Sequence, residues 1–387
     1  MPLIFHRREL AERIAAQVMS DTAGSAAASG IFLAAPRRTG KSTFLREDLR
    51  PQLERLHALT LYVDLWEDRK ADPGQSIVAA IRSGLAGKEG VIARLARSAG
   101  MDKVNVGGLS FDMDRVGLGT GVSATRALAA LSDETAQRIV LIIDEAQHAL
   151  TTEAGADAMF ALKAARDELN SSSHHGMRIV ATGSNRDKLA LLRNNRDQAF
   201  FGAPLVEFPH LGRDYIEWFC SHVNLPGQLD IDAAYTLFVE AGFRPEVLGG
   251  AADAVRFDFA PVTADVQMHF AQQVAKQIEE TQADFLRVIR SLTPLQAAVF
   301  RVLAAKGAEY APFEAATFSL YGKAVASGAM QVDAKLDTPN VQQALSALQE
   351  KGLVWRAARG VYALEEQGHA EMLARAGLLE GLAAGPP

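Results

Sequence analysis

The first half of the chain alternates short, mostly apolar runs with segments whose apolar residues recur at helical spacing. Such runs are typical of strands that are buried on both faces of a sheet. They are Ile31–Ala35, Leu59–Asp64, Arg138–Asp144, Arg178–Gly183 and Leu205–Phe208. Helical patterns at Glu9–Met19, Ser76–Leu95 and Ala158–Leu169 lie between or beside them. We therefore expect an α/β domain in which helices cover both faces of a parallel sheet.

The pattern changes beyond Arg213, where the apolar runs stop. Asp214–Val223, Asp232–Ala241 and Glu246–Phe257 have the spacing of short helices and predict a separate helical domain. From about Thr281 the pattern shifts again. We place the domains at 1–212, 213–280 and 281–370, followed by a tail over 371–387.

The last domain has the order of a winged helix-turn-helix. Thr293 and Thr338 each precede a proline, which predicts a helix with a threonine N-cap and proline at its first position. Leu353–Arg356 and Gly360–Leu364 then predict a short β-hairpin, the wing. A second hairpin is predicted inside the first domain, over the glycine-rich stretch 104–122, where apolar and polar residues alternate.

Composition narrows the class of protein. A chain of 387 residues that is 48% apolar can build several cores. Its net charge of −6 gives no overall attraction to nucleic acid or anionic membrane, so a basic footprint would have to be local. A single cysteine, Cys220, excludes an intrachain disulfide. No run approaches the roughly 18 apolar residues of a membrane helix, and we expect a cytoplasmic protein with no membrane partner.

The strongest chemical signal is the loop after the first apolar run. It fits the phosphate-binding pattern small-x-x-x-x-Gly-Lys-Ser/Thr and predicts a P-loop NTPase core of three αβα layers. Backbone N–H groups of such a loop and the following helix form an anion site. The residues that would bind the nucleotide are Ala35, Pro36, Arg37, Arg38, Thr39, Gly40, Lys41, Ser42 and Thr43.

Individual residues of this loop have separate tasks. Gly40 lets the backbone approach the phosphates, Lys41 would reach the β- and γ-phosphates of ATP, and Ser42 would hold Mg²⁺. Arg37 and Arg38 are surplus to the pattern and could face a partner, nucleic acid or solvent. An ordinary strand–turn–helix is the alternative interpretation of the whole segment.

An acidic pair supplies the second half of the site. Asp144 and Glu145 follow the apolar run Ile139–Ile143. At the end of a strand beside the phosphate loop, Asp144 would bind Mg²⁺ and Glu145 would deprotonate the attacking water. The alternative for such a pair is a helix N-cap, a position that aspartate favours.

With these motifs in order, the chain resembles the AAA+ ATPases. The resemblance rests on Phe5–Leu10, Ala35–Thr43, Ile142–Gln147 and Ala181–Asn185, and it is greatest to the archaeal-type and origin-recognition-like ATPases. These have a helical lid, which would be 213–280 here, and a C-terminal winged helix. The resemblance implies an ATP-hydrolysing protein that needs Mg²⁺.

The resemblance also implies sensor residues. Asn185, or Ser184 beside it, would contact the γ-phosphate and water, unless Asn185 has only a loop role. Arg244 in the lid would contact the γ-phosphate as a second sensor; the alternative is a solvated arginine at a helix end. An arginine finger from a neighbouring subunit of a homo-oligomer would be Arg193 or Arg196.

Two further assignments stay open. Ile4 and Phe5 could flank the adenine ring or pack in the core. The candidate recognition helix Pro339–Glu350 has several amide side chains but no arginine, and basic residues lie at the wing, at Lys351, Arg356 and Arg359. Such a domain could bind duplex DNA or dock a protein client.

Three functions are compatible with these features. The first is an ATPase that couples nucleotide state to movement of the lid and winged helix. The second is a DNA-binding adaptor or switch that binds ATP with little turnover. The third is an activator subunit of an effector system.

Overall fold

A computed structural model describes most of the chain. The described residues are 3–22, 24–68, 70–86, 88, 90, 95, 116–117, 122–171, 173–194, 198–258, 265–326, 335–358, 360–366 and 368–382. Contacts divide the chain into two units. The first consists of Met1–Ala35 and Lys41–Phe208, and the second of Pro36–Gly40 and Pro209–Pro387.

A five-stranded parallel sheet forms the centre of the first unit. Its strands, in spatial order, are β2 (Ala58–Asp64), β5 (Arg138–Asp144), β6 (Met177–Gly183), β1 (Ile31–Ala34) and β7 (Leu205–Glu207). These are the five runs predicted from the sequence, with ends shifted by a residue or so. The parallel sheet of the predicted fold class is therefore confirmed.

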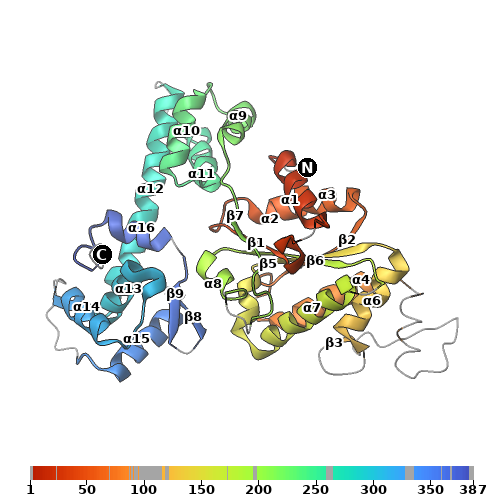
Figure 1. Ribbon diagram of the computed structural model, residues 1–387. Coiled ribbons are helices and arrows are strands. Elements are labelled where there is room, and N and C mark those ends of the chain that lie inside the picture. The colour runs from red at the N-terminus through yellow and green to blue at the C-terminus, as the bar shows by residue number, and fades with distance from the viewer. Residues whose placement is uncertain are drawn as a thin grey trace. The chain divides into compact units, whose positions relative to one another are not determined.

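Helices cover both faces of this sheet (Figure 1). One layer contains α1 (Arg8–Met19) and a continuous helical segment made of α2 (Lys41–Phe44), the π-helical turn η2 (Leu45–Leu49) and α3 (Arg50–Arg55). The other contains α4 (Pro73–Leu85), α6 (Ala124–Thr135) and α7 (Glu153–Ser171). The first unit therefore has three layers, with the sheet between two layers of helices.

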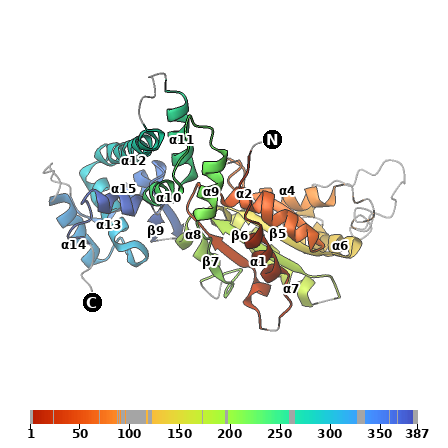
Figure 2. The same cartoon turned by 90° about the horizontal axis from the view of Figure 1, so that it is seen from above.

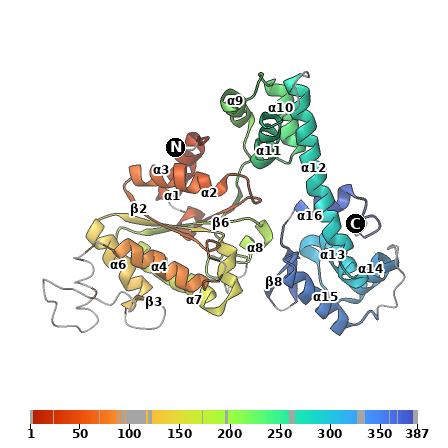
Figure 3. The ribbon, with the colours of Figure 1, turned by 180° about the vertical axis from the view of Figure 1, so that it is seen from behind.

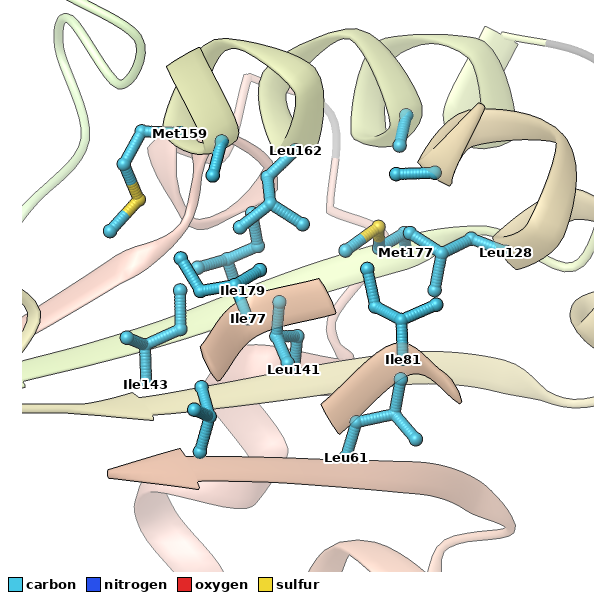
Figure 4. Packing of buried hydrophobic residues seen from close by; sticks show 14 of the residues in the cluster. Leu61, Ile77, Ile81, Leu128, Leu141, Ile143, Met159, Leu162, Met177 and Ile179 are labelled. Carbon is cyan, nitrogen blue, oxygen red and sulfur yellow. The ribbon is translucent and has the colours of Figure 1, made fainter. Parts of the chain in front are cut away.

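Alternation along β5 explains why one strand serves two cores. Ile139, Leu141 and Ile143 belong to the core under α4, α6 and α7, whereas Val140 and Ile142 belong to the core under α1 and α2–α3. Figure 4 shows Leu141 and Ile143 from β5 packed with side chains from the covering helices and neighbouring strands. A strand with both faces buried has to be apolar at consecutive positions, which is why its sequence does not alternate.

Within its described residues, the second unit is helical apart from one hairpin. Its first three helices are α9 (Arg213–His222), α10 (Ile231–Glu240) and α11 (Pro245–Arg256), close to the predicted bounds. A long helix, α12 (Val266–Arg290), packs beside α10 and α11 and continues to α13 and α14 (Figures 2 and 3). Phe270 and Val274 are buried in its first half, and Phe285 and Ile289 join the winged-helix core in its second half.

The predicted boundary at 280/281 therefore falls inside a helix. No proline or glycine occurs between Val266 and Arg290, so nothing in the backbone ends the helix where the sequence pattern shifts. The helical part and the winged-helix part share α12.

The winged helix consists of three helices and a wing. They are α13 (Pro294–Lys306), α14 (Ala315–Ala326), α15 (Thr338–Glu350) and the antiparallel strands β8 (Val354–Ala358) and β9 (Val361–Leu364). Thr293 caps α13, as predicted, and the structure adds a capping box with Gln296. The N-cap of α15 is Asp337 rather than Thr338; its carboxylate accepts the Asn340 N–H. Aspartate and threonine both cap well, and proline fits either of the first two helical positions.

Two predicted segments differ from the structure. Residues 371–382 are not a tail: α16 (Gly368–Arg375) buries Leu373, and Leu382 is also in the winged-helix core. Most of the predicted hairpin at 104–122 lies outside the described residues. In its described part, β3 (Val116–Gly117) pairs with β4 (Val122–Ser123) in parallel, which is not the antiparallel pairing of a hairpin.

Among the residues that the structure describes, no helix is both long and apolar enough to cross a membrane.

Leu141→Ala should destabilise the first unit by about 2–5 kcal/mol, because it removes a fully buried side chain from the middle of the sheet. Denaturant unfolding followed by circular dichroism measures the loss. Phe160→Ala on the outer side of α7, where the side chain is 45% exposed, is the matched control and should change stability by roughly 0.5 kcal/mol or less. Equal effects of the two substitutions would contradict the assignment of the core.

Candidate nucleotide-binding site

The phosphate-loop segment has the predicted strand–loop–helix geometry. β1 ends at Ala34, and α2 begins at Lys41. Gly40 has φ 79°, and an added Cβ there would meet no atom within 4 Å. Conformation rather than crowding therefore favours glycine at this position. Thr39 closes the loop by donating its hydroxyl to the Pro36 carbonyl at 2.9 Å.

The helix after the loop is anchored along its length. Phe44, Leu45, Leu49 and Leu53 are buried against the sheet. This packing fixes the start of the helix, where Lys41 is only 5% exposed.

Asp144 ends β5 and is completely buried. Its Oδ2 atom accepts the Ser42 hydroxyl at 2.6 Å and the Tyr62 hydroxyl at 3.2 Å. Its Oδ1 atom accepts the Thr182 hydroxyl and lies 3.4 Å from Lys41 Nζ. A buried carboxylate is costly unless it is hydrogen-bonded and paired, and here four side chains satisfy it.

Glu145 follows in a left-handed conformation with φ 52°. Lys41 Nζ donates to its Oε1 at 2.7 Å. Its Oε2 accepts the Ser184 hydroxyl at 2.7 Å, the Ser184 N–H at 3.2 Å and the Gln147 amide at 2.6 Å. Uncommon φ values in non-glycine residues are concentrated at functional sites.

The charge of Glu145 is strongly stabilised. Burial opposes ionisation, but the Lys41 ammonium and the hydrogen bonds from Lys41, Ser184 and Gln147 outweigh it and lower the pKa of Glu145 from 4.5 to about 2. The carboxylate is therefore ionised at neutral pH.

The donor set suits Mg²⁺. This ion is usually held by one or two carboxylates together with substrate phosphates and water. Ser42 and Asp144 offer one hydroxyl and one carboxylate that already lie within hydrogen-bonding distance. Within the described part of the chain, no group of three or more His, Cys, Asp or Glu side chains could hold a metal ion.

The residues predicted as sensors have different positions. Asn185 is the N-cap of α8 (Arg186–Ala190), and its side-chain oxygen accepts the N–H groups of Asp187 and Lys188. It is the neighbouring Ser184 that contacts Glu145. Arg244 belongs to the second unit, where it occupies the N-cap position of α11 without a side-chain capping hydrogen bond and donates to the Ala241 carbonyl at 2.9 Å.

The remaining predicted residues are less closely defined. Arg193 is half-buried after α8 and donates to Asn194, whereas Arg196 lies outside the described residues. Ile4 and Phe5 are half-buried. The roles suggested for all of these residues stay predictions.

Four side chains at the site had no role assigned from the sequence: Tyr62, Asp64, Thr182 and Gln147, the last residue of the motif Ile142–Gln147. Asp64 ends β2 and pairs in register with Asp144. Burial raises the pKa of Asp64, and the Asp144 charge adds to this effect. Asp64 could have been identified from the sequence, because polar residues at the carboxyl ends of parallel strands meet at one edge of a sheet.

Comparisons with known proteins give a match in fold only. No family model and no curated protein matches the chain. Among solved structures, a Walker-type ATPase of Pyrococcus abyssi is 17% identical, with 96% of each chain covered and a TM-score of 0.52. The ORC2 protein of Aeropyrum pernix in its ADP form is 14% identical, with 99% of this chain and 96% of that chain covered and a TM-score of 0.55.

A second form of the same ORC2 protein, with ADPNP and ADP, is 13% identical and has a TM-score of 0.50, covering 99% of this chain and 95% of that chain. The chain shares the fold of these archaeal proteins. This likeness agrees with the resemblance to origin-recognition-like AAA+ ATPases that the order of the motifs indicated, and it extends over nearly the whole chain.

Glu145→Gln should reduce the pH dependence of stability. The pKa of Glu145 is lower in the folded state, so its ionisation stabilises the fold fully above pH 4.5, and this contribution is lost as the pH falls toward 2. The difference in unfolding free energy between wild type and variant should be on the order of 3 kcal/mol at neutral pH and shrink below pH 4.5. Urea unfolding over a pH series measures it, with the exposed Glu153→Gln as control. A difference in unfolding free energy that does not vary with pH would contradict the lowered pKa of Glu145.

Proposed function

We propose that the protein binds ATP with Mg²⁺ and hydrolyses it. The observation that carries this proposal is the convergence of Lys41, Ser42, Asp144 and Glu145 within hydrogen-bonding distance at one end of a parallel sheet. The shared fold with archaeal proteins, one of them a Walker-type ATPase, supports it.

The residues divide the chemistry among them. Loop N–H groups and Lys41 bind the phosphates, and Ser42 with Asp144 would hold Mg²⁺, whose positive charge offsets the charge that develops on the phosphates. Glu145 orients a water molecule and accepts its proton. Asn185 or Ser184, Arg244, and an Arg193 or Arg196 finger from a second copy are proposed to contact the γ-phosphate region.

The ion pair between Lys41 and Glu145 links binding to catalysis. Phosphate oxygens compete for the Lys41 ammonium when ATP binds. The Lys41 charge is the largest influence that lowers the pKa of Glu145. Its withdrawal therefore raises that pKa and makes Glu145 a stronger base.

An ATPase assay on Lys41→Ala and Glu145→Gln tests this proposal. Lys41→Ala should weaken ATP binding roughly tenfold to a hundredfold, because a charged hydrogen-bond donor to the phosphates is lost. Glu145→Gln should keep binding and lower kcat by roughly 10²–10⁴. Chelation of Mg²⁺ should abolish turnover.

Glu153→Gln is the control, and thermal unfolding verifies that each variant is folded. Wild-type turnover in Glu145→Gln would rule out this residue as the base. Tight ATP binding with negligible wild-type turnover would instead favour the adaptor function.

We also propose that the winged helix binds duplex DNA. Gln343 and Ser346 are exposed on α15, where side chains could reach base edges, and Lys351 and Arg356 are exposed near the wing, where they could reach phosphates. This local basic footprint is compatible with a chain of negative net charge.

Arg356→Ala should weaken binding to duplex DNA and reduce the slope of log K against log salt by about 1, as expected for one lost phosphate contact. Fluorescence anisotropy over a salt series measures both effects. Arg287→Ala, with an exposed arginine on α12, is the control. If wild type does not bind DNA even at low salt, a protein client becomes the better interpretation.

A further inference from the structure

The two oxygen atoms of Glu145 have different surroundings. Three donors converge on Oε2: the Ser184 hydroxyl, the Ser184 N–H and the Gln147 amide. Oε1 accepts from Lys41 Nζ. The donors to Oε2 belong to the protein framework, whereas Lys41 is the group for which bound phosphates would compete.

Gln147 is built into this arrangement from the framework side. It lies in the 3₁₀ helix η4 (Ala146–Thr151), which begins directly after Glu145, and its side chain is completely buried. The next residue, His148, stacks on Trp66 with ring centroids 4.0 Å apart. The turn that presents Gln147 is therefore packed against the segment after β2.

A second observation concerns Gly183, the last residue of β6. A Cβ added at Gly183 would lie 2.5 Å from Gln147 Oε1, closer than real atoms approach. Its φ is not in the left-handed region, so crowding by Gln147 rather than conformation explains the glycine. The backbone of β6 makes room for the Gln147 amide.

We propose that Gln147 is a positioning residue that, together with Ser184, holds Glu145 by Oε2 and leaves Oε1 as the oxygen that accepts the proton of the attacking water. This inference rests on the proposed ATP hydrolysis and deepens it, because it names the reacting atom. Gln147 itself touches neither ATP nor water in this scheme.

The reaction balances with Oε1 as the base. The water oxygen bonds to the γ-phosphorus while the bond from that phosphorus to the β–γ bridging oxygen breaks. The water proton moves to Oε1, and the products are ADP and inorganic phosphate. A carboxylate held by one oxygen keeps the other in a fixed direction, and a misplacement of about 1 Å costs roughly a hundredfold in rate.

Glutamine suits this position because it is a neutral donor. A carboxylate at 147 would repel Glu145, and an apolar side chain would leave Oε2 with fewer donors. Either change would remove a donor that holds Oε2 in place.

Gln147→Met tests the inference, because methionine matches glutamine in length but cannot donate. We expect kcat to fall about tenfold to a hundredfold while the Kd for a non-hydrolysable ATP analogue stays unchanged. The KM for ATP should stay unchanged, so that the effect falls on kcat alone. Gln17→Met, the same substitution at an exposed position of α1, should behave as wild type.

Two more variants cover the case in which Gln147→Met does not fold. Gln147→Glu keeps the size and should lower kcat further, because the added carboxylate repels Glu145 and displaces it. Gly183→Ala displaces the Gln147 amide without changing it and should lower kcat in the same direction. Thermal unfolding identifies the variants that are folded.

The outcomes are distinguishable. If wild type hydrolyses ATP and the folded Gln147 variants keep its kcat and KM, the inference is overturned and the proposed function stands. If KM rises while kcat is unchanged, Gln147 acts on binding, which also overturns it. A wild type without turnover removes the proposed function and this inference with it.

Discussion

The buried carboxylate of Asp144 is the constraint that organises the site. A charge with no exposed surface needs compensation from its neighbours. That compensation comes from the helix after β1 through Lys41 and Ser42, from β2 through Tyr62, and from β6 through Thr182. Only an arrangement that brings these elements beside the end of β5 satisfies it, and the strand order β2-β5-β6-β1 does so. The same packing that buries the apolar runs therefore assembles the polar site.

The second unit depends on a different constraint, the continuity of α12. Its first half is buried with the preceding helices and its second half with the winged helix. A helix of 25 residues with no internal proline or glycine is a stiff connection. Within this unit, a movement of α9–α11 that carries α12 with it would also move the winged helix, because α12 belongs to both parts.

Much of this architecture was predictable because its signals are local. Consecutive apolar residues predicted all five strands of the parallel sheet, and the helical spacing of apolar residues predicted α9, α10 and α11. The shift of pattern near Thr281 did not mark the end of α12, because the helix has no proline or glycine there and continues to Arg290. Thr338 and Asp337 are both good caps, and only the geometry distinguishes them. The loop and acid motifs predicted Lys41, Ser42, Asp144 and Glu145 for the same reason: each follows an apolar strand directly.

Gln147, Tyr62 and Thr182 could not be identified in this way. Tyr62 and Thr182 lie within mostly apolar runs, where a hydroxyl is usually a minor variation in the packing. Their partner, Asp144, is 82 residues from Tyr62 and 38 from Thr182 in the chain. The role of Gln147 is indicated by Gly183, 36 positions away, where a side chain would collide with the Gln147 amide. Only the folded structure shows that these two residues are neighbours.

A carboxylate with a pKa near 2 is a weak base, and the ion pair with Lys41 is a main cause of this low pKa. If Glu145 kept that pKa throughout, it would accept a proton from water poorly, because a general base works best when its pKa lies near the working pH. Lys41 and the framework donors both lower the pKa, but only Lys41 would be drawn away by phosphate oxygens. The carboxylate would then remain fixed in place by Ser184 and Gln147 while its proton affinity rose. Under the proposed function, the placement of one lysine between an anion-binding loop and a base would keep Glu145 a weak base until a polyphosphate is bound.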